Sequence, residues 1–418
     1  MNLPKIEQAG NIYRLTWAEE GVAAEVRRLA DRNYGPGGEI TWVSLAPGQE
    51  GILHQGYLGL TSTTGKRSLM QALAERQSGK NWKSIVEQLA ILVLRSFREG
   101  AEASLIRTGY GAVTRTPVAI APLVFEKHPY VLFGAPASAK SYLALILAAI
   151  AADEQIQVPP FRCYSKKRVL VLDWESSEAD LAFRLARLQA GFGKTLDELI
   201  TYRPCSMPLS YDIERVQNVV LNYGIDFIII DSLGPAAGGD LNAAQSAQQF
   251  FSALRSLECT SVILAHTAKS HEAKRRTIYG SMFFNALARG ASEVKSFESP
   301  GDDTLSIGIY PRKSNFSRLE RPIGLTLRFD GDEGPVTVTR EDLRQVPDLS
   351  QRLPVRERIL DALCHAPHPL AQGELRERLD DVAANTITKT LSRMMDAKVV
   401  IQVDGRYAAA VEEDLAAF

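Results

Sequence analysis

The stretch YVLFGAPASAKSYLALILAAIAA, residues 130–152, decides the fold of this chain. Its first four residues are apolar and predict a buried strand. The small residues after them predict a tight turn, and the alanine- and leucine-rich run after Lys140 predicts a helix. This order places backbone N–H groups, a lysine and the positive end of a helix dipole around one point, which suits a phosphate group. We therefore predict a loop that binds ATP through Gly134, Ala135, Pro136, Ala137, Ser138, Ala139, Lys140, Ser141 and Tyr142.

The loop follows the pattern G-x-x-x-x-G-K-[S/T] except at one position, because Ala139 stands where the second glycine is expected. In such a loop Lys140 reaches the β and γ phosphates and Ser141 coordinates Mg²⁺, so we expect ATP and Mg²⁺ as cofactors. If the backbone at Ala139 needs a positive φ, alanine adds about 1–2 kcal/mol of strain; otherwise alanine is tolerated. The alternative is an ordinary buried strand, turn and helix whose small residues only pack tightly.

Composition sets the general class of the protein. The chain has 418 residues, of which 45% are hydrophobic and 23% charged, so we expect a soluble protein of two or three domains. A formal net charge of −1 gives no global attraction to nucleic acid or membrane, and DNA binding would need local patches. The four cysteines are scattered, which favours neither a zinc site nor a disulfide framework. With no secretory signal and no apolar run long enough for a membrane span, we predict a cytoplasmic protein without a membrane partner.

Three later apolar strands end in polar side chains that suit a nucleotide site. Asp231 follows one of them and is predicted to hold Mg²⁺, whereas Glu175 follows another and could orient the attacking water. The third leads to His266, which could contact the γ phosphate. Ligands of an open α/β sheet bind outside the carboxyl ends of its strands, so these groups are expected to converge on Lys140. The alternatives are an aspartate that caps a turn, a glutamate that caps the next helix and an ordinary structural histidine.

The pattern of strands and helices divides the chain into three domains. Residues 1–107 mix strands and helices and predict an N-terminal α+β accessory domain, with 108–122 as a linker. Residues 123–345 alternate short apolar strands with helices and predict an α/β core with a mostly parallel sheet. In the N-terminal domain we expect strands at 11–17, 39–45 and 55–61 and helices at 21–33, 66–77 and 82–100. In the core we expect strands at 130–133, 168–173, 227–231, 261–265, 304–310 and 324–329.

The core resembles a known family. The phosphate-binding loop, Glu175, the pair Asp231-Ser232 and the run AHTAK at residues 265–269 are similar to the motifs of RecA-like P-loop ATPases (AAA family ATPases). Among these, the chain resembles the hexameric replicative helicases of the plasmid RepA and DnaB type, over roughly residues 122–340. RepA-like proteins usually have a His-His pair where this chain keeps only His266. The resemblance implies catalytic roles for Lys140, Glu175 and His266.

The resemblance also implies groups that act on a neighbouring subunit's ATP. The segment 280–289 is similar to the family segment whose arginine reaches into the adjacent site, which makes Arg289 the candidate arginine finger. Lys313 and Arg328 lie in segments similar to the two closing strands, where a basic side chain also approaches the neighbour's nucleotide. Oligomerisation, with a hexamer as the expected form, would then be part of catalysis, and an isolated subunit would be nearly inactive. The alternative for Arg289 is a helical surface ion pair with Glu293.

Two loops are expected to contact single-stranded DNA. In ring-shaped RecA-like proteins the loops after the Asp231 strand and after the His266 strand face the central pore, which here are residues 234–245 and 269–278. A small-residue loop beside a basic one suits the approach of a strand's phosphates. The alternative is a solvated surface loop. The basic residues expected to contact DNA are Lys269, Lys274, Arg275 and Arg276.

Residues 354–410 predict a third domain, a winged helix-turn-helix. Helices are expected at 355–364, 372–379 and 384–397, followed by a hairpin at 399–408. In such a domain Lys389 and Arg393 would face the major groove of DNA. Basic and acidic residues nearly balance in this segment, so a contact to a replication protein or a regulatory role is the alternative.

We therefore expect an ATP-hydrolysing, ring-forming motor on single-stranded DNA, a replicative helicase of a plasmid, phage or other mobile element. The alternative is an ATP-dependent DNA-binding switch that regulates recombination, repair or transposition without unwinding. A third hypothesis is a degenerate loop that binds ATP but hydrolyses it slowly. Ala139 is the only residue that suggests it. The aromatic residues of the N-terminal domain could stack on bases, or they could be core residues: Tyr13, Trp17, Trp42 and Tyr57.

Overall fold

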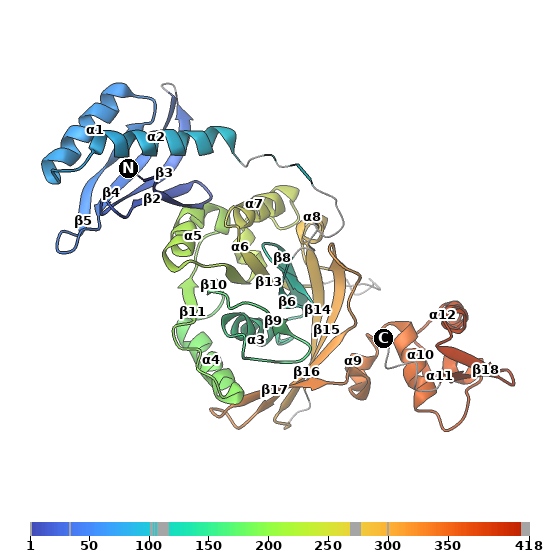
Figure 1. Cartoon of the computed structure of the whole chain (residues 1–418). Helices are drawn as coiled ribbons and strands as arrows, with labels where there is room; N and C mark the ends of the chain where they lie inside the picture. The colour runs from blue at the N-terminus through green and yellow to red at the C-terminus, as the bar shows by residue number, and fades with distance from the viewer. Residues whose placement is uncertain are drawn as a thin grey trace.

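The computed structural model describes residues 2–32, 35–100, 103, 105–106, 117–267, 277–298 and 301–410. Figure 1 shows an N-terminal body in blue, a central body built around a large sheet and a smaller C-terminal body in red. Each body has a hydrophobic core of its own, as independent domains require. Among the described residues no helix has both the length and the apolar character that crossing a membrane requires.

The N-terminal domain is a five-stranded antiparallel sheet with two helices. The strands lie in the order β1-β2-β3-β4-β5, and helices α1 and α2 share one core with them. Tyr13, Trp17 and Trp42 are buried in that core, whereas Tyr57 is half exposed on the other face. Three of the four aromatic residues are therefore core residues. The elements are β1 (Lys5–Ala9), β2 (Ile12–Trp17), β3 (Val22–Arg32), β4 (Gly35–Ser44), β5 (Gly51–Gly59), α1 (Thr63–Arg76) and α2 (Trp82–Glu99).

The predicted helix at 21–33 is wrong, because these residues form β3. Val22, Ala24 and Val26 point into the core at alternate positions, as in a strand. The register with β4 then shifts between Arg27 and Ala30, and this bulge turns Leu29 inward as well. Because of the bulge, the larger inward side chains Val22, Val26 and Leu29 stand four and three residues apart, a spacing that resembles a helix in the sequence.

The N-terminal domain packs on helix α5 (Leu209–Tyr223) of the central domain. Ala9 of β1 belongs to the same hydrophobic cluster as the inner face of α5. Arg14 donates a hydrogen bond of 2.7 Å to the amide oxygen of Asn222. Gly10 lies so close to Gln217 that a Cβ on it would sit 1.8 Å from the amide nitrogen. Strand and helix therefore meet at close range here.

The central domain is built on a nine-stranded sheet in the order β11-β10-β12-β13-β8-β14-β15-β16-β17. The strands from β11 to β14 run parallel, and the three after β14 are antiparallel, so the predicted mostly parallel sheet is confirmed. Alternate residues of β8 enter two different cores: Leu132 packs with α3 and α4, and Phe133 packs with α5, α6 and α7. Helices therefore cover both faces of the parallel strands (Figure 1).

The elements of the central sheet and its helices are as follows. The strands are β8 (Pro129–Gly134), β10 (Val169–Asp173), β11 (Ile200–Pro204), β12 (Phe227–Asp231), β13 (Thr260–His266), β14 (Gly290–Glu298), β15 (Thr304–Ser314), β16 (Ile323–Phe329) and β17 (Val336–Glu341). The helices are α3 (Lys140–Ala152), α4 (Glu178–Phe192), α5, α6 (Leu233–Ala237), α7 (Ala244–Arg255) and α8 (Met282–Leu287). A small separate sheet joins β6 (Val118–Ala121), β7 (Val124–Phe125) and β9 (Arg162–Cys163).

Strand β14 is central in the sheet although nothing in its composition predicts a strand. Its sequence GASEVKSFE contains small and charged residues where a buried strand is usually apolar. Glu293 is 2% exposed, and Arg312 on the next strand neutralises it with a hydrogen bond of 2.6 Å. The alternative of a helical ion pair between Arg289 and Glu293 is therefore wrong, because Glu293 lies in a strand that begins directly after Arg289 and its carboxylate has another partner.

Two buried polar side chains tie the outer strands to the rest of the domain. Arg187 of α4 is 8% exposed and donates to the carbonyl oxygens of Gly331 and Gly334 at 2.6 and 2.7 Å. Tyr310 of β15 is fully buried and donates to the carbonyl of Leu349 at 2.6 Å. The first contact holds the turn between β16 and β17, and the second holds the segment that leads out of the sheet.

The C-terminal body contains three helices and a hairpin around one apolar cluster. Ile359, Leu375 and Ile387, one from each helix, are fully buried in it. Leu370 pairs with Tyr407 of the hairpin, which closes the sheet on the helices. Assignment as a winged helix-turn-helix stays a prediction. The elements are α10 (Val355–Cys364), α11 (Gln372–Arg378), α12 (Ala384–Asp396), β18 (Val400–Val403) and β19 (Arg406–Ala409).

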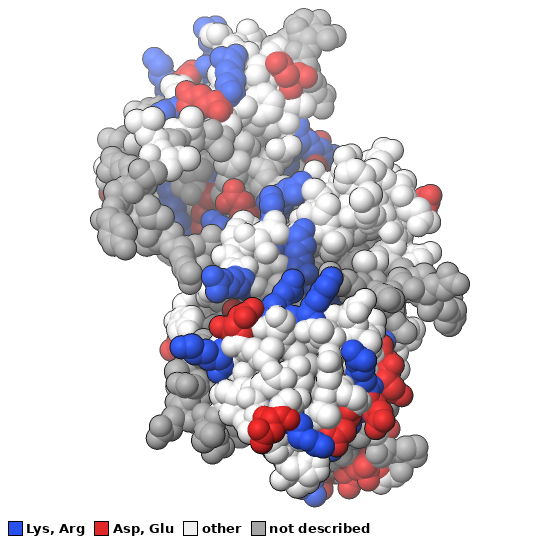
Figure 2. Space-filling view, turned by 90° about the vertical axis from the view of Figure 1, so that its right-hand side faces the viewer, with Lys and Arg blue, Asp and Glu red and all other residues white. Residues whose placement is uncertain are grey.

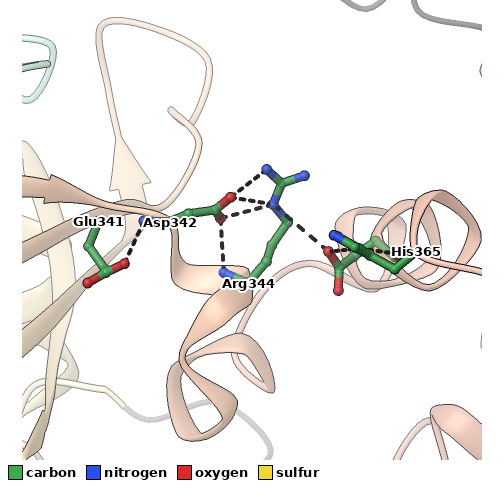
Figure 3. A network of polar contacts seen from close by, with 5 residues as sticks. Glu341, Asp342, Arg344 and His365 are labelled. Atoms are coloured by element: carbon green, nitrogen blue, oxygen red, sulfur yellow. Dashed lines mark hydrogen bonds and ion pairs between the residues drawn. The ribbon is translucent and has the colours of Figure 1, made fainter.

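A polar network joins the end of the central domain to α10 (Figure 3). Arg344 donates to both carboxylate oxygens of Asp342, at 2.6 to 3.1 Å, and lies 4.0 Å from Asp361 of α10. His365 lies 3.1 Å from the same Asp361 carboxylate. Arg344 and His365 are 48% and 71% exposed, so the pairs orient the junction more than they stabilise it.

Candidate nucleotide site

The loop between β8 and α3 has the geometry of a phosphate-binding loop. Gly134 must be glycine, since a Cβ would lie 2.4 Å from the carbonyl of Val294 and 2.5 Å from the hydroxyl of Ser138. Ala137 and Ala139 both have left-handed backbones, with φ of 58° and 59°. The position before the lysine therefore does need a positive φ, and alanine there carries the strain of about 1–2 kcal/mol that an L-residue has in this region.

Lys140 bends back over this loop. It is 9% exposed, and its ammonium donates to the carbonyl of Ala135 at 2.7 Å and more weakly to Gly134 and Ser138 at 3.3 Å. Burial lowers the pKa of this ammonium, and the carboxylates of Asp231 and Glu175 oppose that shift. The positive charge thus lies against the loop, where an incoming phosphate would compete for it.

Ser141 and Asp231 form the candidate Mg²⁺ site. The serine hydroxyl donates to the carboxylate of Asp231 at 2.9 Å. Burial raises the pKa of Asp231 to about 6, a shift that the serine opposes and the charges of Glu175 and Asp173 reinforce. In the part of the chain that the structure describes, no three His, Cys, Asp or Glu side chains are placed to hold a metal. One carboxylate and one hydroxyl nevertheless fit Mg²⁺, which usually keeps several waters and binds phosphate oxygens.

Glu175 lies beside Asp231, because their strands are neighbours. Asp173 and Asp231 occupy paired positions on β10 and β12. The buried Asp173 accepts hydrogen bonds of 2.9 Å from the N–H of Glu175 and 3.0 Å from the N–H of Ser176, which shape the turn. The Glu175 carboxylate itself accepts a hydrogen bond from Ser232. Helix α4 is capped by Ser177, so the alternative that Glu175 caps that helix is wrong.

His266 reaches the same edge from β13. It pairs with Gly134 across the parallel strands, and the N–H of Thr267 donates to the Gly134 carbonyl at 3.2 Å. The histidine side chain is exposed. The structure thus places His266 beside the phosphate-binding loop. The predicted DNA contacts Lys269, Lys274, Arg275 and Arg276 lie outside the described residues.

Arg289 lies at the opposite edge of the sheet from this site. Its N–H donates to the carbonyl of Pro129, the first residue of β8, at 3.0 Å. Gly134, at the other end of β8, is five residues further on, roughly 17 Å at 3.3 Å per residue. Arg289 is exposed. It therefore cannot serve the phosphate-binding loop of its own chain.

Lys313 lies close to Arg289, whereas Arg328 lies far from it. Lys313 donates to the carbonyls of Asn285 and Ala286 at 2.6 and 2.9 Å. Burial lowers its pKa, and the charge of Arg289 lowers it further, so the two cations are close. Arg328 is exposed and pairs with Thr304, at the end of β15 that faces the phosphate-binding edge. The structure therefore brings Lys313 and Arg289 together at one end of the strands and places Arg328 at the opposite end, where the phosphate-binding loop lies.

Three supporting residues of the site had no role assigned from the sequence, although Ser232 was named there beside Asp231. Asp173 orients the turn of Glu175, Ser232 binds its carboxylate, and Ser296 donates at 3.2 Å to the carbonyl of Ala137 in the phosphate-binding loop. Asp173 lies two residues before Glu175, and Ser232 directly follows Asp231. Their nearness to these predicted functional residues was the only signal in the sequence that they support the site. Ser296 had none, because β14 was not predicted as a strand.

This sheet and this site have the arrangement of a P-loop nucleotide-binding domain. Residues 111–272, which contain the phosphate-binding loop, Glu175, Asp231 and His266, match a protein family described as AAA domain. The match covers less than half of the chain. The family implies nucleotide binding, typically with Mg²⁺, and ATPase activity.

Comparison with solved structures finds similarity to the KaiC-like protein PH0186 from the hyperthermophilic archaeon Pyrococcus horikoshii OT3. The two are 15% identical with a TM-score of 0.38, over 55% of this chain and 98% of that one. A comparison with curated protein sequences found no significant match.

Proposed function

We propose that this protein is a ring-forming, ATP-hydrolysing motor on single-stranded DNA and acts as a replicative helicase of a plasmid, phage or other mobile element. The observation that carries the proposal is the placement of two half-sites on opposite edges of one sheet. Lys140, Asp231 and Glu175 lie at one edge, and Arg289 and Lys313 lie at the other. Within the described residues neither of these two cations has a carboxylate partner.

Two such half-sites favour a head-to-tail assembly. A contact that joins the phosphate-binding edge of one copy to the Arg289 edge of the next is heterologous, and it forms a closed ring when its rotation closes. In that ring Arg289 lies beside the neighbour's nucleotide, and a hexamer is the expected size. Arginine fingers supplied in this way raise the rate about 10³–10⁵-fold in comparable systems.

The residues of one chain divide the work of hydrolysis. Lys140 and the backbone N–H groups of the loop bind the phosphates, and Ser141 and Asp231 are placed to hold Mg²⁺, which would neutralise phosphate charge. Glu175 orients the attacking water through its carboxylate, and His266 contacts the γ phosphate. Arg289 of the adjacent copy completes the site.

Several features support single-stranded DNA as the partner. Leu241, in the first loop expected to face DNA, accepts a hydrogen bond of 2.7 Å from the N–H of Ser281, which lies three residues beyond the second expected loop. Figure 2 shows Lys and Arg side chains gathered across the middle of one face, and Asp and Glu gathered toward its lower end. A local basic zone on a chain of net charge −1 fits contacts to a phosphate backbone.

The C-terminal domain offers a second contact. Lys389 and Arg393 are exposed on α12, together with Thr388 and Asn385. As a winged helix-turn-helix, this domain would bind duplex DNA or a replication partner through that helix.

The test is steady-state ATP hydrolysis with and without single-stranded DNA. We expect DNA to stimulate the wild-type protein, Lys140→Ala to lose nucleotide binding, and Glu175→Gln to bind ATP without hydrolysing it. Hydrolysis that ignores DNA would favour the regulatory switch instead of the motor. Stimulated hydrolysis without strand separation in an unwinding assay would exclude the helicase.

A mixing experiment tests the shared site directly. Lys140→Ala lacks the phosphate-binding half and Arg289→Ala lacks the finger, so each alone should be inactive. When the two are mixed and reassembled in equal amounts, about one interface in four combines an intact loop with an intact finger. We expect about a quarter of wild-type activity to return. A mixture as inactive as its components would contradict a finger supplied by the neighbour.

A further inference from the structure

Ser232 links the catalytic carboxylate to a helix, and its hydrogen bond is unusual for its position. It directly precedes α6, where a serine hydroxyl normally accepts a hydrogen bond from a backbone N–H of the first turn. Here it makes no such cap and donates instead to Glu175. Ser232 is 3% exposed, so no solvent replaces either contact.

The sequence explains why the hydroxyl turns to Glu175. A capping serine bonds the N–H of the second or third helical residue, and the third residue of α6 is Pro235, which has no N–H. Gly234 offers the one remaining donor. The hydroxyl is therefore left for a partner from another strand, and the turn shaped by Asp173 presents the Glu175 carboxylate to it.

This contact engages an oxygen that the reaction needs. Glu175 orients the attacking water by accepting a hydrogen bond from it. One oxygen of this carboxylate accepts a hydrogen bond from Ser232. Hydrogen bonds to a charged acceptor are among the stronger ones in proteins. The serine therefore restrains the glutamate.

Helix α6 leads from this contact to a segment expected to face DNA. The helix is five residues long, and Gly238 and Gly239 follow it with φ of 65° and 64°. Leu241, two residues later in this segment, accepts a hydrogen bond from the N–H of Ser281. Movement of the segment after α6 can therefore reach Ser232 through this short helix.

We propose that Ser232 is a positioning residue that restrains Glu175 until single-stranded DNA binds beside α6. DNA that displaces the segment after α6 shifts the start of the helix, withdraws the Ser232 hydroxyl and frees the carboxylate to orient water. This inference rests on the proposed function, because it assigns the coupling between DNA and hydrolysis to one hydrogen bond.

The test compares Ser232→Ala with Ser232→Thr, which keeps the hydroxyl. We expect Ser232→Ala to raise the DNA-free rate about tenfold, equivalent to about 1.4 kcal/mol, and to lower the stimulation by DNA in proportion. Ser232→Thr should behave as wild type in both respects. Ser261→Ala is the matched control, because Ser261 is a fully buried serine on β13 whose hydroxyl has no hydrogen-bond partner.

The outcomes separate this inference from the proposed function. An unchanged or lower DNA-free rate in Ser232→Ala overturns the restraint, since the serine would then only support Glu175 or the fold. If DNA fails to stimulate the wild type, the motor proposal and the release of Glu175 by DNA both fail, whereas a rise in the DNA-free rate of Ser232→Ala still supports the restraint itself. If the wild type hydrolyses nothing, Ser232→Ala must gain activity for the restraint to stand.

Discussion

Replacing Ala139 by glycine should stabilise the ATPase domain, although glycine usually destabilises. Ala139 has φ of 59° and ψ of 20°, a left-handed conformation that costs an L-residue about 1–2 kcal/mol. Glycine removes this cost but enlarges the conformational freedom of the unfolded chain, which costs about 0.4–1 kcal/mol. The difference leaves Ala139→Gly more stable by about 0.5–1 kcal/mol. The same reasoning applies to Ala137, whose φ is 58°.

Thermal unfolding measures this effect, with an alanine in an ordinary helix as the control. Ala182 is exposed in the middle of α4, where exchange for glycine should cost about 1 kcal/mol. For a domain of this size we expect Ala139→Gly to raise the melting temperature by about 1–4 °C and Ala182→Gly to lower it by a similar amount. If both variants lose stability equally, Ala139 does not have a left-handed backbone in solution and the reasoning is wrong.

Three further predictions concern buried polar groups. Because the pKa of Asp231 is raised by burial, the folded protein holds that proton more tightly than the unfolded chain, and metal-free protein should lose stability as pH rises from about 4 to 6. Melting temperatures of Asp231→Asn relative to wild type should therefore increase over this range, and a constant difference would contradict the shift. Arg187→Lys cannot reach both carbonyls and should cost about 2 kcal/mol in denaturant unfolding, whereas an unchanged midpoint would show that the contact contributes nothing. Tyr310→Phe leaves the Leu349 carbonyl unpaired and should cost about 1–2 kcal/mol in the same assay, and a neutral result would mean that water reaches that carbonyl.

The sequence predicts the parallel strands well because their composition and their geometry agree. β8, β10, β12 and β13 are apolar on both faces, and each ends at the edge where a polar side chain follows. Strand order then brings these side chains together without further information. The positions of Lys140, Asp231, Glu175 and His266 follow from local patterns alone.

The remaining features depend on contacts between distant segments. The burial of Glu293 in β14 is possible only because Arg312 neutralises it from another strand, so no local pattern indicates that strand. The bulge in β3 depends on its pairing with β4, and without it the sequence imitates a helix. The bond between Ser232 and Glu175 joins residues 57 positions apart. Strand pairing, more than residue type, determines these features.

Strand β14 has a mechanical consequence for the proposed ring. It begins directly after Arg289, and its residue Ser296 holds the backbone of Ala137 in the phosphate-binding loop. The segment between them pairs with β15 along its length and with β8 over its first four residues, so it moves as a stiff rod. When Arg289 engages a neighbour's nucleotide, a pull along this rod reaches the loop that binds the chain's own nucleotide. Each ATP site would then be coupled to the next one, and the subunits would hydrolyse ATP one after another around the ring and not in random order.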